Sequence, residues 1–460
     1  MKLIFLAVFM TLCIPPLTAT PCKTVVRVKQ QAMNYACQTQ RRPLQKAFGL
    51  IAIPDVSQNI GGGGLLGNIF GAAQNLIGKV LNIVGIKILQ VNLPDLDVKL
   101  MPRVGVQVSV DTGLHIQGRV LLLGGIEIKV GAGVLADVRV SKTAKGFPIL
   151  AVSACKSILG EIQVTAGGFS LIPTIVKVIQ GHIHAILSDR LCLTVSNVFL
   201  GMNADLGLMA HVTPITGDLE MQYTMPSPPV VTGDYMDMDM NVEYKVQDQV
   251  IELPSSANDF TLPPGAGSEN SMVNMGFSED FFIAMFTAIH SSGGFNMEKS
   301  AGFIKQKYTQ SLPVNLKIVV TETPDVLFSS SQLLINLSPQ IEMFVVLQDS
   351  HAQHLLTLNV GVTFAAKLEV KGEKLKTSLS LAGDLSLAVA SSSYGPCKTK
   401  ISVLSGYVRA VFEKAFLVQI NAEMSVGLAL PSLPNVQLTD PVVTIEEDYA
   451  VMSCDLQYIK

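Results

Sequence analysis

Hydrophobic and polar positions follow two different periods along this chain. Between Ile86 and Ser153 they alternate one by one, as in NLPDLDVKLMPRVGVQVSVDTGLHIQGRV and IEIKVGAGVLADVRVS. Turn sequences such as Asp111-Thr112-Gly113 and Gly124-Gly125 separate these runs. A period of two is typical of strands with one buried face, so the region predicts a series of β-strands.

The segment FSLIPTIVKVIQGHIHAILSDRLC, residues 169 to 192, has a helical period instead. Its apolar residues recur at spacings of three and four, while Lys177, Gln180, His184 and Ser188 form the opposing stripe. We therefore predict an amphipathic helix with a broad apolar face that ends at Cys192. His182 and His184 would lie about 200° apart on it, so they cannot close on one metal ion.

The same order of elements recurs in the second half. VVRVKQQAMNYA, residues 25 to 36, predicts an early amphipathic helix, and residues 224 to 270 form a proline-containing connector with one or two strands. Ser278 is the N-cap of a predicted helix over 278 to 292. Strand patterns and a second long helix over 401 to 424 follow. Helices and strands on either side of a connector predict two copies of one plan.

The first residues and the cysteines of the chain indicate its cellular compartment. Residues 1 to 19 have the basic, apolar and small-residue parts of a secretory signal, so we expect a secreted, extracellular protein. No later run of 18 apolar residues predicts a transmembrane helix. Six cysteines remain after the signal, and an even number favours disulfides, of which fifteen connectivities are open. Cys155, at the end of the strand region, is a natural partner for Cys192.

The charge is divided unevenly between the halves. Residues 20 to 216 contain 18 Lys and Arg against 9 Asp and Glu, whereas residues 217 to 460 contain 14 against 27. The basic half points to an anionic partner, although the difference is also compatible with an incidental surface dipole.

Signatures of catalysis are missing from the sequence. The glycine-rich run over 59 to 85 lacks the GK[ST] of a phosphate loop, and GAGVLA at 131 to 136 precedes a strand pattern instead of a helix. We find no GxSxG, no HExxH and no paired-carboxylate signature, and the seven histidines are scattered. We expect no enzyme, no cofactor, no metal and no nucleic-acid partner.

Five stretches in order resemble one family. They are VVRVKQQAMNYA with PLQKAF, NLPDLDVKLMPRVGVQVSVDTGLHIQGRV, the Cys155 and Cys192 pair, MVNMGFSEDFFIAMFTAIHSSGGFNM, and LALPSLPNVQLTDPVVTIEEDYAVMSCDLQYI. They are similar to the superfamily of bactericidal/permeability-increasing protein (BPI), lipopolysaccharide-binding protein and PLUNC, and most to its long two-domain BPI fold-containing B group. The resemblance covers the whole chain after the signal.

The resemblance implies an α+β fold. This is a boomerang of two similar barrels, each a twisted antiparallel sheet wrapped around a long helix, joined by a central sheet. The expected domains are a signal peptide (1–19), an N-terminal barrel (20–223), a connector with central-sheet strands (224–270) and a C-terminal barrel (271–460). It also implies a Cys155–Cys192 disulfide. Cys397 is expected to pair with Cys454, because both lie in the second half and the last strand has to pack near the second long helix, and Cys22 with Cys37 then remains by elimination.

A lipid-binding function is also implied by the resemblance. The apolar helix face would line a lipid groove, with the candidates Ile172, Ile175, Val176, Ile179, Ile183, Ile186 and Leu187. The basic charge is dispersed, and the candidates for contact with anionic head groups are Arg41, Arg42, Lys46, Lys142 and Lys145.

The expected partners are phospholipid or lipopolysaccharide, and a bacterial or anionic membrane surface. The expected role is innate antibacterial defence. The alternative is a surface-active or matrix protein of mucosa or eggshell that keeps the fold but binds little specific ligand. Asn336, in Asn-Leu-Ser, is a predicted glycosylation site.

Overall fold

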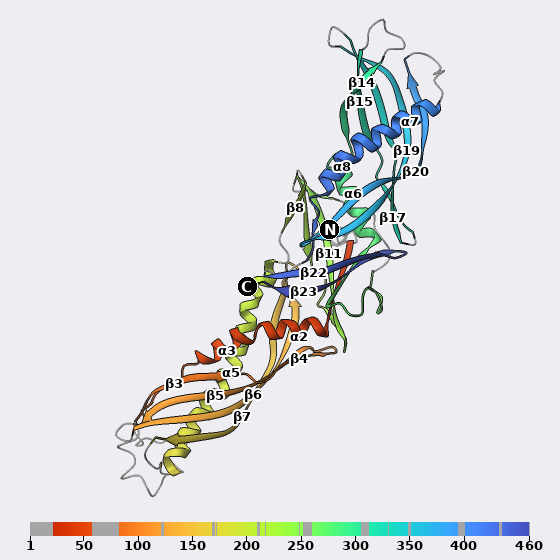
Figure 1. Cartoon of the computed structure of the whole chain (residues 1–460). Coiled ribbons are helices and arrows are strands. Elements are labelled where there is room, and N and C mark those ends of the chain that lie inside the picture. The colour runs from red at the N-terminus through yellow and green to blue at the C-terminus, as the bar shows by residue number, and fades with distance from the viewer. Residues whose placement is uncertain are drawn as a thin grey trace, which may run out of the picture. The chain divides into compact units, whose positions relative to one another are not determined.

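The computed structural model in Figure 1 describes most of the chain. The described residues are 22–57, 82–120, 124–167, 171, 173–208, 212–216, 218–247, 249–251, 260–304, 312–329, 331–347, 351–393, 401–431 and 435–459. The predicted signal peptide, most of the glycine-rich run, Ile172 and Cys397 lie outside these residues.

The chain divides into two compact units. The N-terminal unit consists of Val28–Leu208 and Ser227–Asp237, and the C-terminal unit consists of Met1–Arg27, Met209–Pro226 and Met238–Lys460. Residues 209–223, expected in the first barrel, therefore belong to the C-terminal unit. The reason is pairing, because the strand Leu219–Thr224 hydrogen bonds to residues 241–246 of that unit.

A six-stranded antiparallel sheet forms the N-terminal unit. Its order is β2-β3-β5-β6-β7, and β4 pairs with β5. The strands are β2 (Val56–Ser57), β3 (Asn82–Asn92), β4 (Leu96–Met101), β5 (Gly105–Val120), β6 (Gly124–Lys142) and β7 (Pro148–Ala166), and the helices are α2 (Gln30–Thr39), α3 (Arg41–Gly49) and α5 (Pro173–Leu208). Buried and exposed residues alternate along β5 and β6, so the period of two predicted the strands and their buried face.

The C-terminal unit repeats this plan with an eight-stranded antiparallel sheet. Its order is β14-β15-β18-β19-β17-β16, with β20 on β19 and β21 on β20. The strands are β14 (Met297–Ile304), β15 (Leu312–Val320), β16 (Asp325–Ser329), β17 (Gln332–Leu337), β18 (Pro339–Val346), β19 (Ala352–Lys371), β20 (Lys374–Ser392) and β21 (Leu428–Ala429). One long helical segment accompanies the sheet as α7 (Ile401–Val411), the π-helical turn η1 (Phe412–Phe416) and α8 (Leu417–Met424).

A third sheet has nine strands in the order β22-β23-β13-β1-β11-β9-β8, with β10 and β12 paired to β11. They are β1 (Cys22–Lys29), β8 (Thr213–Thr216), β9 (Leu219–Thr224), β10 (Val230–Val231), β11 (Tyr235–Val246), β12 (Gln249–Val250), β13 (Val273–Ser278), β22 (Val436–Ile445) and β23 (Tyr449–Tyr458). Helix α6 (Glu279–Ser291) follows β13, and the Ser278 hydroxyl accepts a hydrogen bond from the Phe281 N–H, as its N-cap position predicted.

Two predicted helix boundaries were wrong. Residues 25–29 form the end of β1 instead of the start of a helix, because Val25 and Val26 are both buried in a central strand. The long helix of the first half continues 16 residues beyond Cys192, to Leu208. The residues after Cys192 contain no proline, and buried Leu191 and Val195 continue the apolar pattern. The predicted α+β class with two similar sheet-and-helix units is confirmed.

Arg27 holds the loop that precedes β13. Its side chain is 1% exposed, and its guanidinium donates hydrogen bonds to the carbonyls of Leu262 (2.7 Å), Pro263 (2.6 Å) and Pro264 (3.0 Å). The bond to Leu262 is buried, and the buried guanidinium needs such partners because a buried charge without them destabilises the fold.

We predict that Arg27→Met lowers the free energy of unfolding by at least about 3 kcal/mol, because three charge-assisted bonds of a buried guanidinium are lost. The control Arg409→Met removes an exposed guanidinium paired with Asp384 and Glu413, and we expect a loss below about 1 kcal/mol. Urea denaturation followed by circular dichroism measures both, and equal losses would contradict the role given to Arg27.

Candidate functional site

Every fourth residue of α5 from Ile175 to Val195 is buried. The buried residues are Ile175, Ile179, Ile183, Leu187, Leu191 and Val195, each at most 4% exposed. Because four residues turn a helix by about 400°, the buried line advances by about 40° at each step and winds through roughly 200°. A straight stripe would need steps of three and four. The buried row thus follows the twist of the sheet that packs on it.

Three further rows complete the surface of α5. The exposed row is Lys177, Gly181, Ala185, Asp189, Leu193 and Asn197. One flank, here the β7 flank, consists of Val176, Gln180, His184, Ser188, Cys192 and Ser196. The opposite flank, here the α3 flank, consists of Val178, His182, Ile186, Arg190, Thr194 and Val198.

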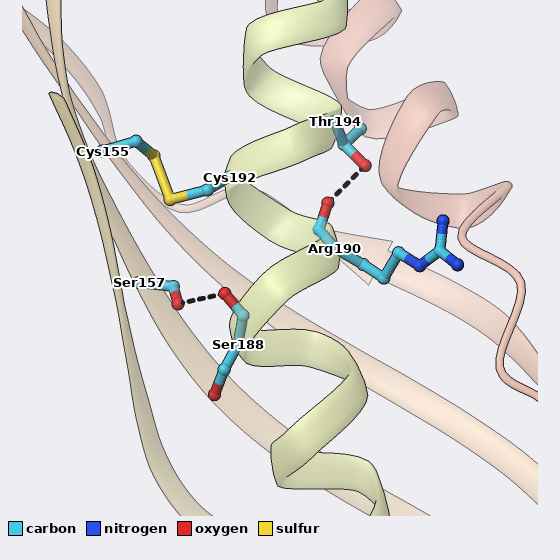
Figure 2. Close-up of a disulfide and its surroundings, with 6 residues drawn as sticks. All are labelled: Cys155, Ser157, Ser188, Arg190, Cys192 and Thr194. Carbon is cyan, nitrogen blue, oxygen red and sulfur yellow. Dashed lines mark hydrogen bonds between the residues drawn. A yellow bond between two sulfur atoms is a disulfide. The ribbon is translucent and has the colours of Figure 1, made fainter. Parts of the chain in front are cut away.

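Polar bonds and one covalent bond fasten the β7 flank to the sheet. The Gln180 amide donates to the Ile162 carbonyl (2.8 Å), and the Ser157 hydroxyl donates to the Ser188 carbonyl (2.7 Å). Cys155 and Cys192 form a disulfide with a Cα–Cα distance of 5.8 Å. Figure 2 shows both connections on one side of the helix.

Asn203 connects the C-terminal part of α5 to β7. Its side chain accepts from the Leu150 N–H (2.6 Å) and donates to the Leu150 carbonyl (3.0 Å), as a neighbouring strand would. β7 ends the order of the six-stranded sheet, so its outer backbone groups need such partners. Side chains of α5 thus replace part of a missing strand along β7.

The α3 flank has few such bonds and several apolar side chains. Val178, Ile186 and Val198 are half-buried. His182 Nε2 lies 2.9 Å from the Pro54 carbonyl oxygen, and the Thr194 hydroxyl donates within the helix to the Arg190 carbonyl (2.7 Å). Arg190 and Thr194 point away from β7 in Figure 2. Helix α3 packs against α5, and Leu50 just after α3 is 73% exposed. This seam therefore contains apolar side chains that are partly accessible.

The structure separates the predicted groove residues into three groups. Ile175, Ile179, Ile183 and Leu187 belong to the buried row, so they form the core between helix and sheet. Val176 lies on the β7 flank and Ile186 on the α3 flank, so these two do not line one common surface.

Only some of the predicted basic residues are available to a ligand. Arg41 donates to the carbonyls of Leu93 and Pro94, so it fixes α3 to the segment after β3. Arg42 and Lys46 are exposed and four residues apart on α3. Lys142 is the last residue of β6, and Lys145 lies in the turn between β6 and β7. Arg190, which is exposed on the α3 flank, was not among the predicted residues, because which flank faces α3 depends on the packing of α5 on its sheet.

The structure leaves two cysteines free and holds no metal cluster in its described part. Cys37 and Cys454 are free thiols, so the expected pairs Cys22–Cys37 and Cys397–Cys454 are not formed. Burial and the Asp97 carboxylate raise the pKa of Cys37 to about 11, and burial and Asp455 raise the pKa of Cys454 to about 12. Both thiols are therefore poor nucleophiles at neutral pH. Among the described residues, no group of three His, Cys, Asp or Glu could hold a metal ion.

Geometry explains why Cys22 does not reach Cys37. Strand β1 carries the chain about 23 Å from Cys22 to Lys29 at roughly 3.3 Å per residue. The helical residues up to Cys37 return at most about 12 Å at 1.5 Å per residue. A disulfide needs Cα atoms within about 7 Å.

The long helix of the C-terminal unit has the same row. Val408, Phe412, Phe416, Ile420 and Met424 are four residues apart and at most 8% exposed. Asn421 accepts from the Leu379 N–H (2.7 Å) and donates to the Leu379 carbonyl (2.9 Å), as Asn203 does with Leu150. The rings of Phe364, Phe412 and Phe416 lie with centroids 5.2 to 6.0 Å apart. This core is therefore filled with aromatic side chains.

Asn336, the predicted glycan acceptor, lies in β17. Its amide nitrogen donates to an Asp325 carboxylate oxygen (3.2 Å), and its amide oxygen accepts from the Thr363 hydroxyl (2.7 Å). Glycosylation at this position stays a prediction.

A curled antiparallel sheet fastened to one long helix, present twice, defines the class of protein. The profile of the LBP/BPI/CETP family matches with its N-terminal domain over residues 32–203 and with its C-terminal domain over residues 301–458. The chain belongs to this family.

Its relatives in sequence include human BPI fold-containing family B member 2, which is 28% identical over 473 residues and matched over 98% of both chains. The mouse protein of that name is 26% identical, over 94% of both chains. Among solved structures, lipopolysaccharide binding protein is similar with a TM-score of 0.63 and 18% identity, over 96% of this chain and 99% of that one. That similarity confirms the fold.

We predict that replacing both Cys155 and Cys192 by serine lowers the free energy of unfolding by about 3 to 4 kcal/mol. The bond closes a loop of 37 residues, and this is the loss that the chain-entropy model gives for it. Chemical denaturation of the double variant measures the change, with the free thiol variant Cys37→Ser as control. Denaturation midpoints that coincide for the double variant and the control would contradict the prediction.

Proposed function

We propose that this protein is a secreted lipid-binding protein that holds the acyl chains of an amphiphile along the α3 flank of α5. The observation that carries the proposal is the difference between the two flanks. Bonds and a disulfide close the β7 flank, whereas half-buried apolar side chains remain along the α3 flank.

The composition of α5 supports an apolar ligand. Ile175–Asn203 is long and apolar enough to cross a membrane by length and composition alone, and only 17% of its most apolar stretch is buried. A soluble core helix would bury more of such a surface. Because the buried row and the disulfide fix α5 to its own sheet, an acyl chain is the simpler cover for what remains. Each methylene buried there contributes about 0.8 kcal/mol.

Basic side chains at the same seam support an anionic head group. Arg42 and Lys46 are exposed on α3, and Arg190 projects from the α3 flank. The chain over 20 to 216 also has an excess of Lys and Arg over Asp and Glu, 18 against 9. Phospholipid and lipopolysaccharide both combine acyl chains with phosphate, and the name of the structural relative gives lipopolysaccharide as its ligand.

The C-terminal unit is the weaker candidate. Its helix row contains two phenylalanines that pack with Phe364, where α5 has Ile, Leu and Val. Residues 217 to 460 also contain 27 Asp and Glu against 14 Lys and Arg, which repels anionic head groups. The signal-like residues 1 to 19 support secretion, and membership of this family supports a role in antibacterial defence.

A surface-active protein is the second candidate function. Leu193 in the exposed row of α5 is 49% exposed, and Leu200 further along the helix is 59% exposed. Exposed leucines on one helix favour adsorption to an interface without capture of a single lipid.

We predict that Ile186→Trp and Ile186→Glu each reduce lipid loading at least tenfold, the first by filling the α3 flank and the second by adding a charge to it. The matched control Leu193→Glu changes the exposed row and should leave loading within twofold. The measurement is mass spectrometry of lipid bound to the full-length protein after incubation with phospholipid or lipopolysaccharide. Unchanged loading in both Ile186 variants would contradict the site, and loss of surface activity with Leu193→Glu alone would favour the second function.

We predict that Arg42→Gln with Lys46→Gln weakens binding to vesicles with phosphatidylglycerol about thirtyfold at low salt. Each basic residue near an anionic surface contributes about 1 kcal/mol, so two contribute about 2 kcal/mol. Binding should also weaken at physiological salt, where the Debye length is about 8 Å. The control, Lys367→Gln with Lys371→Gln, makes the same change of charge in the C-terminal unit. Equal effects of the two pairs in a vesicle sedimentation assay would contradict the assignment.

A further inference from the structure

A hollow of about 700 Å³ lies within the C-terminal unit, between the loop 263–271 and the strands β22 and β23. The residues that line it are Pro263, Gly265, Ala266, Gly267, Ser268, Asn270, Ser271, Asp440, Val442, Thr444, Glu446, Tyr449, Ser453, Cys454 and Asp455. It contains no part of either long helix, so it is independent of the lipid site proposed above.

The loop wall of this hollow is held in one conformation. Besides the Arg27 bonds, the amide of Asn274, which is 1% exposed, donates to the Ala266 carbonyl (3.0 Å). The Ser268 N–H donates to the Ser453 hydroxyl (2.8 Å). Gly267 has φ +77°, and a Cβ there would lie 2.7 Å from Ser453 Oγ, so only glycine fits. A wall fixed by buried partners needs no ordering when a ligand binds.

One face of β22 forms the floor. Asp440, Val442 and Thr444 of β22 and Glu446, the residue that follows the strand, are alternate residues, and all of them line the hollow. β22 ends the order of the nine-stranded sheet. A register shift between Thr439 and Val442 gives Asp440 a φ of +50°, and Val442 is 60% exposed. The floor therefore offers carboxylates at its two ends and an apolar side chain between them.

The lining is acidic, and none of its residues is Lys, Arg or His. Asp455 accepts a hydrogen bond from the Met272 N–H (2.9 Å), so this carboxylate has a structural partner. Tyr449 packs on Phe260 with ring centroids 5.8 Å apart, and burial and the Glu446 carboxylate raise the pKa of its phenol. An aromatic ring beside a carboxylate is a favourable place for an ammonium or guanidinium group.

The spacing of the carboxylates restricts the ligand. Asp440 and Glu446 are separated by at most roughly 20 Å of strand at about 3.3 Å per residue. In the described residues no three acidic, His or Cys side chains are grouped closely enough for a metal ion. A single small cation would meet only one carboxylate, whereas an extended chain with several cationic groups meets both.

We propose that this hollow binds an extended basic peptide segment, with Lys or Arg side chains at Asp440 and Glu446 and an apolar residue over Val442. The volume lies within the range of about 300 to 1,000 Å³ that is usual for ligand sites. The bulge and Pro441 interrupt the free edge of β22, so recognition uses the face of the strand and its side chains instead of strand addition.

The test is fluorescence anisotropy with the full-length protein and a labelled seven-residue peptide that has lysine at positions 1 and 7, valine at position 3 and serine elsewhere, so that the two lysines and the valine share one face of the extended chain. We expect saturable binding that weakens with salt, and at least tenfold weaker binding by Asp440→Asn with Glu446→Gln. Val442→Lys places a competing cation on an exposed position and should weaken binding to a similar extent. The control Glu298→Gln removes an exposed carboxylate of β14 and should stay within twofold.

Three results would overturn the proposal. They are no saturable binding by the unchanged protein, equal binding of a peptide in which glutamate replaces lysine, and unchanged affinity in the Asp440 and Glu446 double variant. Sedimentation measures whether a second copy of the chain binds at the hollow. If the double variant dissociates a dimer but leaves the affinity for the peptide unchanged, that result also contradicts the proposal. Circular dichroism and lipid loading of each variant show that the fold and the lipid site are intact.

Discussion

The backbone edge of a long strand is the constraint on which each unit depends. β7 and β20 are both 19 residues long, and each has a neighbouring strand along most of its length on one side only. Unpaired N–H and C=O groups over such a length attract other strands. In both units an asparagine of the long helix, Asn203 or Asn421, bonds to both backbone groups of one residue of that strand. In the N-terminal unit Gln180, Ser188 and the disulfide extend the connection.

This connection determines how the apolar surface of α5 is divided. Since the β7 flank of the helix is bonded along β7, the buried row has to turn with the sheet. Apolar side chains that the sheet does not contact therefore lie on the α3 flank. The C-terminal helix has the same four-residue row but fills it with phenylalanine. The two units thus share a pattern of packing and differ in the side chains that fill their cores.

Sequence reasoning predicted the parts of this arrangement that depend on local pattern. Alternation predicted β5 and β6, and the spacing of Ile175, Ile179 and Ile183 predicted a buried helix face. Sequence reasoning could not place Val176 and Ile186 on different flanks of α5. Which flank the sheet covers depends on the twist of that sheet, and residues distant in the sequence form it. The valines of β1 were assigned to a helix for a related reason. The segment VVRVK is too short to distinguish a helical period from the period of two of a strand. Its residues form a strand because they are buried on both faces.

The roles of basic residues could not be predicted from the sequence either, as Arg41 and Arg190 show. Both are basic residues of the positively charged half, yet one is used to satisfy backbone carbonyls and the other projects from the α3 flank. Composition counts them equally. Their difference depends on the position of α3, which is itself fixed by buried Leu44 and Phe48.

The fastening of α5 along one side also determines how this unit can deform. A helix that is bonded to its sheet along one side moves most easily by rotation about that side. The disulfide and the bonds of Gln180, Ser157 and Asn203 lie along this side, whereas the contact of His182 with Pro54 lies across the opposite gap. A rotation of this kind would open the unit on the side of Val178 and Ile186 and leave the strand edge of β7 covered.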